Sequence, residues 1–485
     1  MKTIFDISSP GRRASTMPKA GLDADVMQVL QRIPEHLRRT SAPALPEVSE
    51  LDLVRHYTNL SRKNWAIDVG PYPLGSCTMK YNPKIHEQVA GLGGFRQLHP
   101  WQPEEQTQGA LRLLGEMERD LAEITGMSRV TFQPAAGAAG ELTGLLLIRA
   151  FHKANNDERD TVLIPDSAHG TNPATVRLAG YKVKQIPSDE RGLVDLEALR
   201  KAVGPNVAGL MLTNPNTLGL FERDIEQIAA AIHGVGGLLY YDGANLNAIM
   251  GIVRPGDMGF DVVHMNLHKT FTTPHGGGGP GSGPVAVSER LARFLPKPLP
   301  AQDPKTGKWF WDNNRPDSIG RVHGFHGNFA MVLRAYTYVR SLGADGLHAV
   351  SERAVLNANY LRKRIEDVYP MAHPGLCMHE FVATAKKFKK DGVRAMDIAK
   401  RLIDLGFHPP TVYFPLVVEE AIMAEPTETE SKQSLDALAD ALLQIAGEDA
   451  DRLHEAPVTT PVGRLDEALA ARELRLRWTP AESSN

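Results

Sequence analysis

Short apolar runs alternate with amphipathic segments through the middle of the chain. Apolar runs bounded by Gly, Pro or Asp are typical of buried strands, and apolar positions that recur every three or four residues are typical of helices. The pattern predicts strands at 129–132, 161–164, 182–186, 207–213, 237–241, 261–265 and 284–287. Around them it predicts helices at 106–125, 140–152, 172–178, 195–203, 225–232 and 289–294. This alternation favours a mostly parallel sheet covered on both faces, which binds its ligand at the carboxyl ends of the strands.

The two ends of the chain follow other patterns. Residues 1 to about 60 are rich in Pro, Arg and Ser, with helical spacing at 24–32 and 50–60, and they are typical of an arm that lies on a partner subunit. After residue 325 the pattern predicts helices at 330–341, 354–368, 395–405 and 434–445, and strand-like runs at 380–385 and 412–415. We therefore expect four parts: an N-terminal arm and extended segment (1–100), a large domain (101–325), a small α/β domain (326–453) and a charged tail (454–485).

Composition excludes several classes of protein. Of the 485 residues, 42% are hydrophobic and 23% are charged. The chain has 54 basic and 57 acidic side chains, which gives a net charge of −3. This balance gives no electrostatic case for nucleic-acid or membrane binding. Cys77 and Cys377 are the two cysteines, too few for a disulfide framework and unconvincing as a metal pair. No long apolar run and no secretory signal is evident, so we expect a cytoplasmic protein without a metal.

Lys269 follows the predicted strand 261–265 and precedes a glycine-rich stretch. Nine of the fourteen residues after Thr270 are Gly or Pro, including four consecutive glycines at 276–279. A lysine at the end of a buried strand is costly unless its amine has a partner or a chemical role. A desolvated amine is a nucleophile towards carbonyl carbon, so the position suggests a Schiff base with a cofactor. Taken alone, the motif also fits a surface lysine before a flexible loop.

Asp242 closes the predicted strand 237–241. A carboxylate there is costly unless it is paired with a cation. A protonated pyridinium nitrogen is such a cation, and the pairing keeps the ring protonated so that it can accept electrons. The alternative is an aspartate that caps the following helix. The order of the motifs places Asp242 and Lys269 at the same edge of the predicted sheet.

Two further turns lie at predicted strand ends. The small residues of 132–141, including Ala136, Gly137 and Ala138, open a helix whose backbone amides could bind phosphate, although such turns often serve only close packing. His169 lies in the polar turn 165–173, where its ring could stack on a planar cofactor or make a structural hydrogen bond. A phosphate turn, a histidine, an aspartate and a lysine together are the inventory needed to hold pyridoxal phosphate.

The same stretches resemble a known family. They are similar to the pyridoxal-phosphate subunit of glycine dehydrogenase (decarboxylating), the P-protein of the glycine cleavage system, and within it to the second (β) subunit of the two-subunit form. The matching stretches are 72–82, 132–141, 166–173, 213–219, 241–245, 266–281 and 425–432. The resemblance implies the fold type I of pyridoxal-phosphate-dependent transferases (aspartate aminotransferase-like), with a mostly parallel seven-stranded sheet and a smaller C-terminal α/β domain.

The resemblance also implies roles for individual residues. Lys269 would carry the cofactor covalently, His169 would stack on its ring and Asp242 would pair with the ring nitrogen. The remaining cofactor-binding residues would be Ala136, Gly137, Ala138, Ala244 and His268. Ala135 and Ala136 depart from relatives that carry Asn and Ser there, so part of the phosphate shell is expected to come from His268, Thr270 or a neighbouring subunit.

The activity implied is decarboxylation of glycine with transfer of the aminomethyl group to the lipoyl arm of the H-protein. The implied partner is an α subunit, in an α2β2 arrangement. Two other classes stay open from the sequence: another lysine-bound pyridoxal enzyme, such as an amino-acid decarboxylase or cysteine desulfurase, and a non-enzymatic subunit of the same fold. Arg321, His323 and His326 are candidates for binding the substrate carboxylate, with hydrogen bonding between domains as the alternative.

Overall fold

The computed structural model describes residues 2–15, 31–41, 43–275 and 281–476. The chain falls into two compact units, Met1–Val69 and Gly70–Asn485. The first unit contains the 3-10 helix η1 (Glu35–Leu37) and helix α2 (Glu50–Ser61), whose N-cap Ser49 accepts a hydrogen bond from the Asp52 amide. Helix α2 confirms the prediction at 50–60, whereas the helix predicted at 24–32 lies almost entirely outside the described residues.

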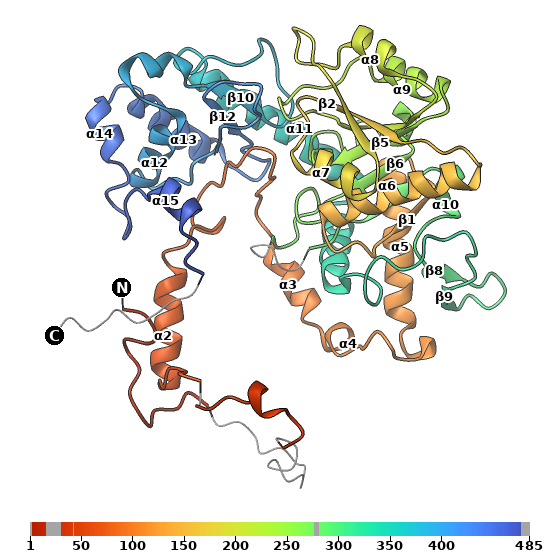
Figure 1. The fold of residues 1–485 in the computed structure, drawn as a ribbon, viewed down its shortest axis with the longest axis horizontal. Coiled ribbons are helices and arrows are strands. Elements are labelled where there is room, and N and C mark those ends of the chain that lie inside the picture. The colour runs from red at the N-terminus through yellow and green to blue at the C-terminus, as the bar shows by residue number, and fades with distance from the viewer. Residues whose placement is uncertain (1, 16–30, 42, 276–280, 477–485) are drawn as a thin grey trace. The chain divides into compact units, whose positions relative to one another are not determined.

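The second unit is built on a seven-stranded sheet in the order β1-β7-β6-β5-β4-β2-β3 (Figure 1). The strands are β1 (Arg129–Thr131), β2 (Thr161–Pro165), β3 (Lys182–Ile186), β4 (Val207–Thr213), β5 (Leu238–Gly243), β6 (Val262–Met265) and β7 (Val285–Val287). Neighbouring strands from β3 to β6 pair in parallel, and β7 runs antiparallel to both β6 and β1. The predicted mostly parallel sheet is confirmed.

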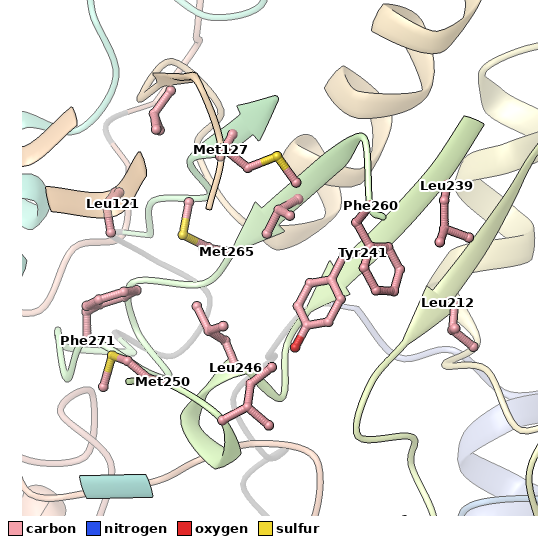
Figure 2. Packing of buried hydrophobic residues seen from close by; sticks show 14 of the residues in the cluster. Leu121, Met127, Leu212, Leu239, Tyr241, Leu246, Met250, Phe260, Met265 and Phe271 are labelled. Carbon is pink, nitrogen blue, oxygen red and sulfur yellow. The ribbon is translucent and has the colours of Figure 1, made fainter. Parts of the chain in front are cut away.

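Helices cover both faces of this sheet because its strands are apolar on both sides. Leu239 and Tyr241 of β5 pack into one hydrophobic cluster, and the alternate residues Leu238 and Tyr240 pack into another. Figure 2 shows the first cluster, in which Tyr241 and Phe260 meet edge to face with ring centroids 4.9 Å apart. The helices that belong to this part are α5 (Gln108–Thr125), α6 (Gly137–Ala154), α7 (Thr171–Leu178), α8 (Leu196–Ala202), α9 (Ile225–Gly234) and α10 (Glu289–Ala292).

A smaller antiparallel sheet, β10-β12-β11, follows a long helix in the chain. Helix α11 (Phe329–Ile365) spans both helices predicted at 330–341 and 354–368. It is kinked at Gly343, the residue in it whose backbone is not helical, with φ of 64°. The sheet consists of β10 (Phe381–Thr384), β11 (Thr411–Val412) and β12 (Ala421–Ala424), and it packs with α12 (Ala395–Asp404) and α13 (Lys432–Ile445) around a separate apolar cluster. The predicted domain boundaries at residues 100, 325 and 453 stay a prediction.

Short elements complete the described chain. They are α3 (Lys84–Ala90), α4 (Gly93–Arg96), η2 (Glu104–Gln106), η3 (Leu246–Ala248), η4 (Pro255–Met258), β8 (Leu299–Gln302), β9 (Trp309–Asp312), η6 (Lys386–Asp391), α14 (Ala450–Glu455) and α15 (Glu467–Arg472). The hairpin of β8 and β9 was not predicted from the sequence. Among the described residues, no helix combines the length and the apolar character that a membrane span requires.

Glu222 is a buried carboxyl group in the turn after β4, and it makes stability depend on pH. Its Oε2 accepts a hydrogen bond from the Val194 amide at 2.9 Å, and burial raises the pKa of Glu222 to about 7. The corresponding pKa in an unfolded chain is about 4.3, so the folded state binds the proton more tightly. The free energy of unfolding therefore falls as pH rises from the unfolded value to the folded one.

We expect Glu222→Gln, which stays neutral, to be more stable than the wild type at pH 8 by about 1 to 3 kcal/mol and nearly equal to it at about pH 4, below the unfolded pKa. Calorimetric Tm values at the two pH values measure the difference. A difference that is the same at both would contradict the assignment.

Candidate active site

The carboxyl ends of the parallel strands bring the predicted residues to one edge of the large sheet. Asp242 lies at the end of β5, His169 follows β2, and Lys269 follows β6. The positive charge of Lys269 acts on both of the others. It adds to burial in lowering the pKa of His169, and it is one of the groups that stabilise ionised Asp242. The structure therefore brings these three side chains to the same edge of the sheet, and their roles stay a prediction.

Asp242 is a buried carboxylate whose charge is balanced by several donors. Burial favours its neutral form, but His264, a hydrogen bond from Asn172, the Ala244 amide and Lys269 outweigh burial and lower the pKa of Asp242. Asn172 Nδ2 donates to Oδ2 at 2.9 Å, and the Ala244 amide donates to Oδ1 at 3.0 Å. Oδ2 accepts one hydrogen bond and keeps a lone pair for a further donor. Asp242 is therefore a buried carboxylate with one oxygen, Oδ2, that can accept a hydrogen bond from a cation.

His264 is a functional residue that the sequence reasoning missed. It pairs with Asp242 across β5 and β6, and its Nε2 lies 3.3 Å from Asp242 Oδ1. Its Nδ1 lies 2.9 Å from the hydroxyl of Tyr240, which is fully buried. A hydrogen bond thus joins Tyr240 to His264, and a close polar contact joins His264 to Asp242. A histidine inside an otherwise apolar strand was the available signal.

The amine of Lys269 is held by a loop from an earlier part of the chain. Its Nζ donates to the carbonyl oxygen of Ser76 at 2.9 Å. Ser76 and Thr78 both have positive φ, 62° and 31°. Such backbone costs about 1 to 3 kcal/mol per residue and persists only where the surroundings hold it. The surroundings that hold this turn are therefore part of the site.

Two buried carboxyl groups bind the turn. Glu380 Oε2 accepts from the Ser76 amide at 2.6 Å, and Glu425 Oε2 accepts from the Thr78 amide at 2.9 Å. Burial raises the pKa of Glu425 to about 7, and burial together with the neighbouring Glu425 raises the pKa of Glu380 well above its ordinary value. Both were missed by the sequence reasoning. The signal would have been a carboxyl residue at the end of an apolar strand, as for Asp242, since Glu380 precedes β10 and Glu425 follows β12.

A second lysine, Lys80, binds the loop that contains Ser76 and Thr78 to other parts of the same unit. Lys80 Nζ donates to Glu428 Oε1 and Asn247 Oδ1, both at 2.8 Å, and to the Tyr338 hydroxyl at 3.2 Å. The side chains of Lys80 and Glu428 are 1% and 7% exposed, so this is a buried ion pair in which each charge needs the other. Residues 75–80 are consequently fixed at both ends.

The start of helix α6 forms a cradle for an anion. The helix begins at Gly137 without a side-chain cap, so its first amides are available to a ligand. Backbone approaches it closely: a Cβ on Gly137 would lie 2.2 Å from Asn266 Oδ1, and one on Gly283 would lie 2.1 Å from the Ala136 carbonyl. The hydroxyl groups of Ser282, next to Gly283 in the chain, and of Thr270 are buried and have no hydrogen-bond partner among the described residues. These features fit a phosphate group.

Histidines and a cysteine complete the surroundings of Lys269. The ring of His169 keeps an exposed face, and its Nδ1 lies 3.0 Å from Thr171 Oγ1. Burial, with His275 and Lys269 nearby, lowers the pKa of His268 to about 3. Cys77 Sγ lies 3.8 Å from His275 Nε2, and burial raises the pKa of Cys77, which keeps it a neutral thiol and a weak nucleophile. The glycines 276–279 lie outside the described residues.

The three candidates for the substrate carboxylate lie in a segment that contacts the residues before helix α6, since the Val322 amide donates to Gln133 Oε1 at 3.3 Å. The ring of His326 stacks on Trp311 with centroids 3.8 Å apart, and the Arg321 guanidinium lies 3.5 Å from the Phe325 carbonyl. Within the described residues, no hydrogen bond or ion pair joins Arg321, His323 or His326 to Asp242 or Lys269. Cys377 is buried in the apolar cluster around β10, where burial raises its pKa to about 12.

Comparison with known proteins agrees with this geometry. Residues 14–300 match the model of the glycine cleavage system P-protein, and residues 350–466 match that of the C-terminal domain of glycine dehydrogenase. A probable glycine dehydrogenase (decarboxylating) subunit 2 from Caldanaerobacter subterraneus is 58% identical over 480 residues, 98% of either chain. The chain belongs to the P-protein family of the glycine cleavage system. A second probable subunit 2, from Desulforamulus reducens, is also 58% identical and covers 99% of either chain.

Solved structures confirm the fold expected of a P-protein. The crystal structure of an inhibitor-bound glycine decarboxylase (P-protein) superposes with a TM-score of 0.73 at 23% identity, covering 87% of this chain and 95% of the other. A NifS-like protein matches with a TM-score of 0.57 at 14% identity, over 76% of this chain and 97% of the other. The predicted class, fold type I of the pyridoxal-phosphate-dependent enzymes, is therefore confirmed.

Proposed function

We propose that this P-protein chain is the pyridoxal-phosphate-binding subunit of a glycine dehydrogenase, which decarboxylates glycine and transfers the aminomethyl group to the lipoyl arm of the H-protein. The observation that carries the proposal is that a buried Asp242 with a lowered pKa and the amine of Lys269 lie at one edge of the sheet, close enough for the lysine charge to act on the carboxylate. Membership of the P-protein family selects glycine from the substrates that this fold can serve.

The residues present fit pyridoxal phosphate. Lys269 Nζ would bind the aldehyde carbon, Asp242 Oδ2 would accept from the ring nitrogen, and the exposed face of His169 would cover the ring. The phosphate would bind at the start of α6, formed by Ala136, Gly137 and Ala138, with the hydroxyls of Thr270 and Ser282 and with His268 close to Lys269. Ala244 contributes its amide to Asp242. When bound, the protonated ring supplies a sink for the electron pair released as carbon dioxide leaves.

The protein groups divide the remaining work. Asp242 stays ionised in a dry site, so it favours the protonated ring nitrogen. The Tyr240–His264 pair orients that carboxylate from below. Lys269 must leave the Ser76 carbonyl and lose a proton before its amine can react. Residues 75–80, fixed by Glu380, Glu425 and Lys80, exclude water above the amine.

The partners follow from the same proposal. As a subunit 2, the chain would act in the cytoplasm with a subunit 1, as α2β2, and with a lipoylated H-protein. Exchange of labelled bicarbonate into the carboxyl group of glycine tests this. We expect exchange when this chain, subunit 1, pyridoxal phosphate and lipoylated H-protein are combined, and none with H-protein that lacks the lipoyl group. Absence of exchange in the complete mixture would refute the proposal.

A further inference from the structure

The carbonyl that accepts from Lys269 lies between two amides that donate to buried carboxyl groups. Ser76 provides both the carbonyl and the first amide, and the second amide belongs to Thr78. We propose that Glu380 and Glu425 are positioning residues of the reaction, which hold the turn 76–78 so that the Ser76 carbonyl orients the Lys269 amine. Neither carboxyl group need touch the substrate for this role.

The conformation of the turn supports the proposal. Ser76 and Thr78 adopt left-handed backbone that a serine and a β-branched threonine rarely take, with φ of 62° and 31°. Glu380 and Glu425 flank strands of the small sheet, and the Gly75 amide donates a hydrogen bond to the Met423 carbonyl of the same sheet. Asn245 Nδ2 donates to Glu380 Oε1 at 3.2 Å and thereby fixes that side chain from the large sheet. Glu380 and Glu425 therefore connect the small sheet to the turn 76–78, and Glu380 also connects it to Asn245.

Charge gives the pair a second effect on Lys269. The groups that face Glu380 and Glu425 are His379, Cys77, Glu428 and Lys269. His379 is neutral, because burial lowers its pKa to about 3, and Cys77 is a neutral thiol. Among these four groups Lys269 is thus the cation, and it favours the ionised forms of both glutamates. Glu425, with a pKa of about 7, carries negative charge near the amine above that pH, whereas burial keeps Glu380 largely neutral.

Acylation of Lys269 in the full-length, cofactor-free chain tests the proposal. Each glutamate is changed to Met, which keeps the volume but removes the acceptor and the charge, and to Gln, which keeps an acceptor oxygen. Glu222→Met is the matched control, because Glu222 is also buried, also accepts from a backbone amide and has a pKa near that of Glu425. Trace acetic anhydride is applied across a pH series, and acetylation of Lys269 is quantified by peptide mass spectrometry against exposed Lys182.

We expect Glu380→Met and Glu425→Met to move the midpoint of Lys269 acylation to lower pH, with about tenfold faster labelling at about pH 8, since the ammonium loses its oriented acceptor and, in Glu425→Met, nearby negative charge as well. Glu425→Gln should shift by about threefold and Glu380→Gln by less, and Glu222→Met should not shift. Equal shifts in Met and Gln variants would overturn the positioning role, as would an unchanged profile or an equal shift in the control. If a Met variant fails to fold by circular dichroism, the Glu380→Gln/Glu425→Gln double variant decides, and an unchanged midpoint refutes the proposal.

This inference rests on the proposed function only in taking Lys269 as the reactive amine. The labelling experiment contains neither cofactor nor glycine. Failure of the exchange assay together with the expected acylation profile would therefore refute the proposed activity and leave the positioning role standing. Normal exchange together with an unchanged acylation profile would refute the positioning role and leave the proposed activity standing.

Discussion

Replacing Lys269 with alanine is expected to abolish covalent attachment of pyridoxal phosphate and to lower glycine–bicarbonate exchange on the order of a thousandfold or more, because no other group would supply the amine. Among the residues that the structure describes, the Lys269 side chain donates one hydrogen bond, to the Ser76 carbonyl, so we expect Tm to change little. Borohydride reduction after addition of pyridoxal phosphate, followed by peptide mass spectrometry, measures the attachment directly.

Lys182→Ala provides the control for the loss of a lysine. Lys182 is exposed at the start of β3 and pairs only with Asp160 at the surface, so its removal should leave both attachment and exchange unchanged. Retention of the reduced label on another lysine in the Lys269→Ala protein, with normal exchange, would contradict the assignment of Lys269.

Asp242→Asn is expected to lower exchange by about a hundredfold to a thousandfold, since the fixed negative charge that favours a protonated ring nitrogen is lost. An asparagine would also direct its NH2 group at donors, because Asn172 and the Ala244 amide both donate to Asp242. We expect the visible band of the bound cofactor to shift and the cofactor to bind more weakly. Absorbance titration and the exchange assay measure the two effects.

Asp261→Asn is the matched control for Asp242. Asp261 is likewise a buried carboxylate beside β6, but it pairs with His233 and Arg290 instead of lying near Lys269. Its substitution should lower Tm without changing the cofactor spectrum. Unchanged release of carbon dioxide by the Asp242→Asn protein would refute the role of that residue.

Most strands of the large sheet could be predicted from the sequence because they are buried on both faces and their apolar runs are unambiguous, although β3 is mostly exposed. The positions of Asp242 and Lys269 after buried strands could also be predicted, since a charged residue there costs free energy unless it is paired. It did not predict β12, because Ala421-Ile422-Met423-Ala424 has no strand signature of its own and becomes a strand by pairing with β10 and β11.

The rest of the site depends on tertiary contacts that no local pattern reports. Ser76, Glu380 and Glu425 lie far apart in the chain, and the packing of the small sheet brings them to the Lys269 amine. The sequence analysis predicted a break in the helix after residue 341 but made it too long, because residues 344–353 are helical and Gly343 is the non-helical residue in α11. Tertiary packing determined these features.

The order in which the binding groups occur in the chain has a consequence for biosynthesis. The ribosome synthesises the Ser76 turn first, then Asp242 and Lys269, and only much later Glu380 and Glu425, which flank strands of the small sheet. A nascent polypeptide that already contains Lys269 therefore lacks the carboxyl groups that bind the turn beside the amine. The complete set of contacts around the amine can form only when translation is almost finished.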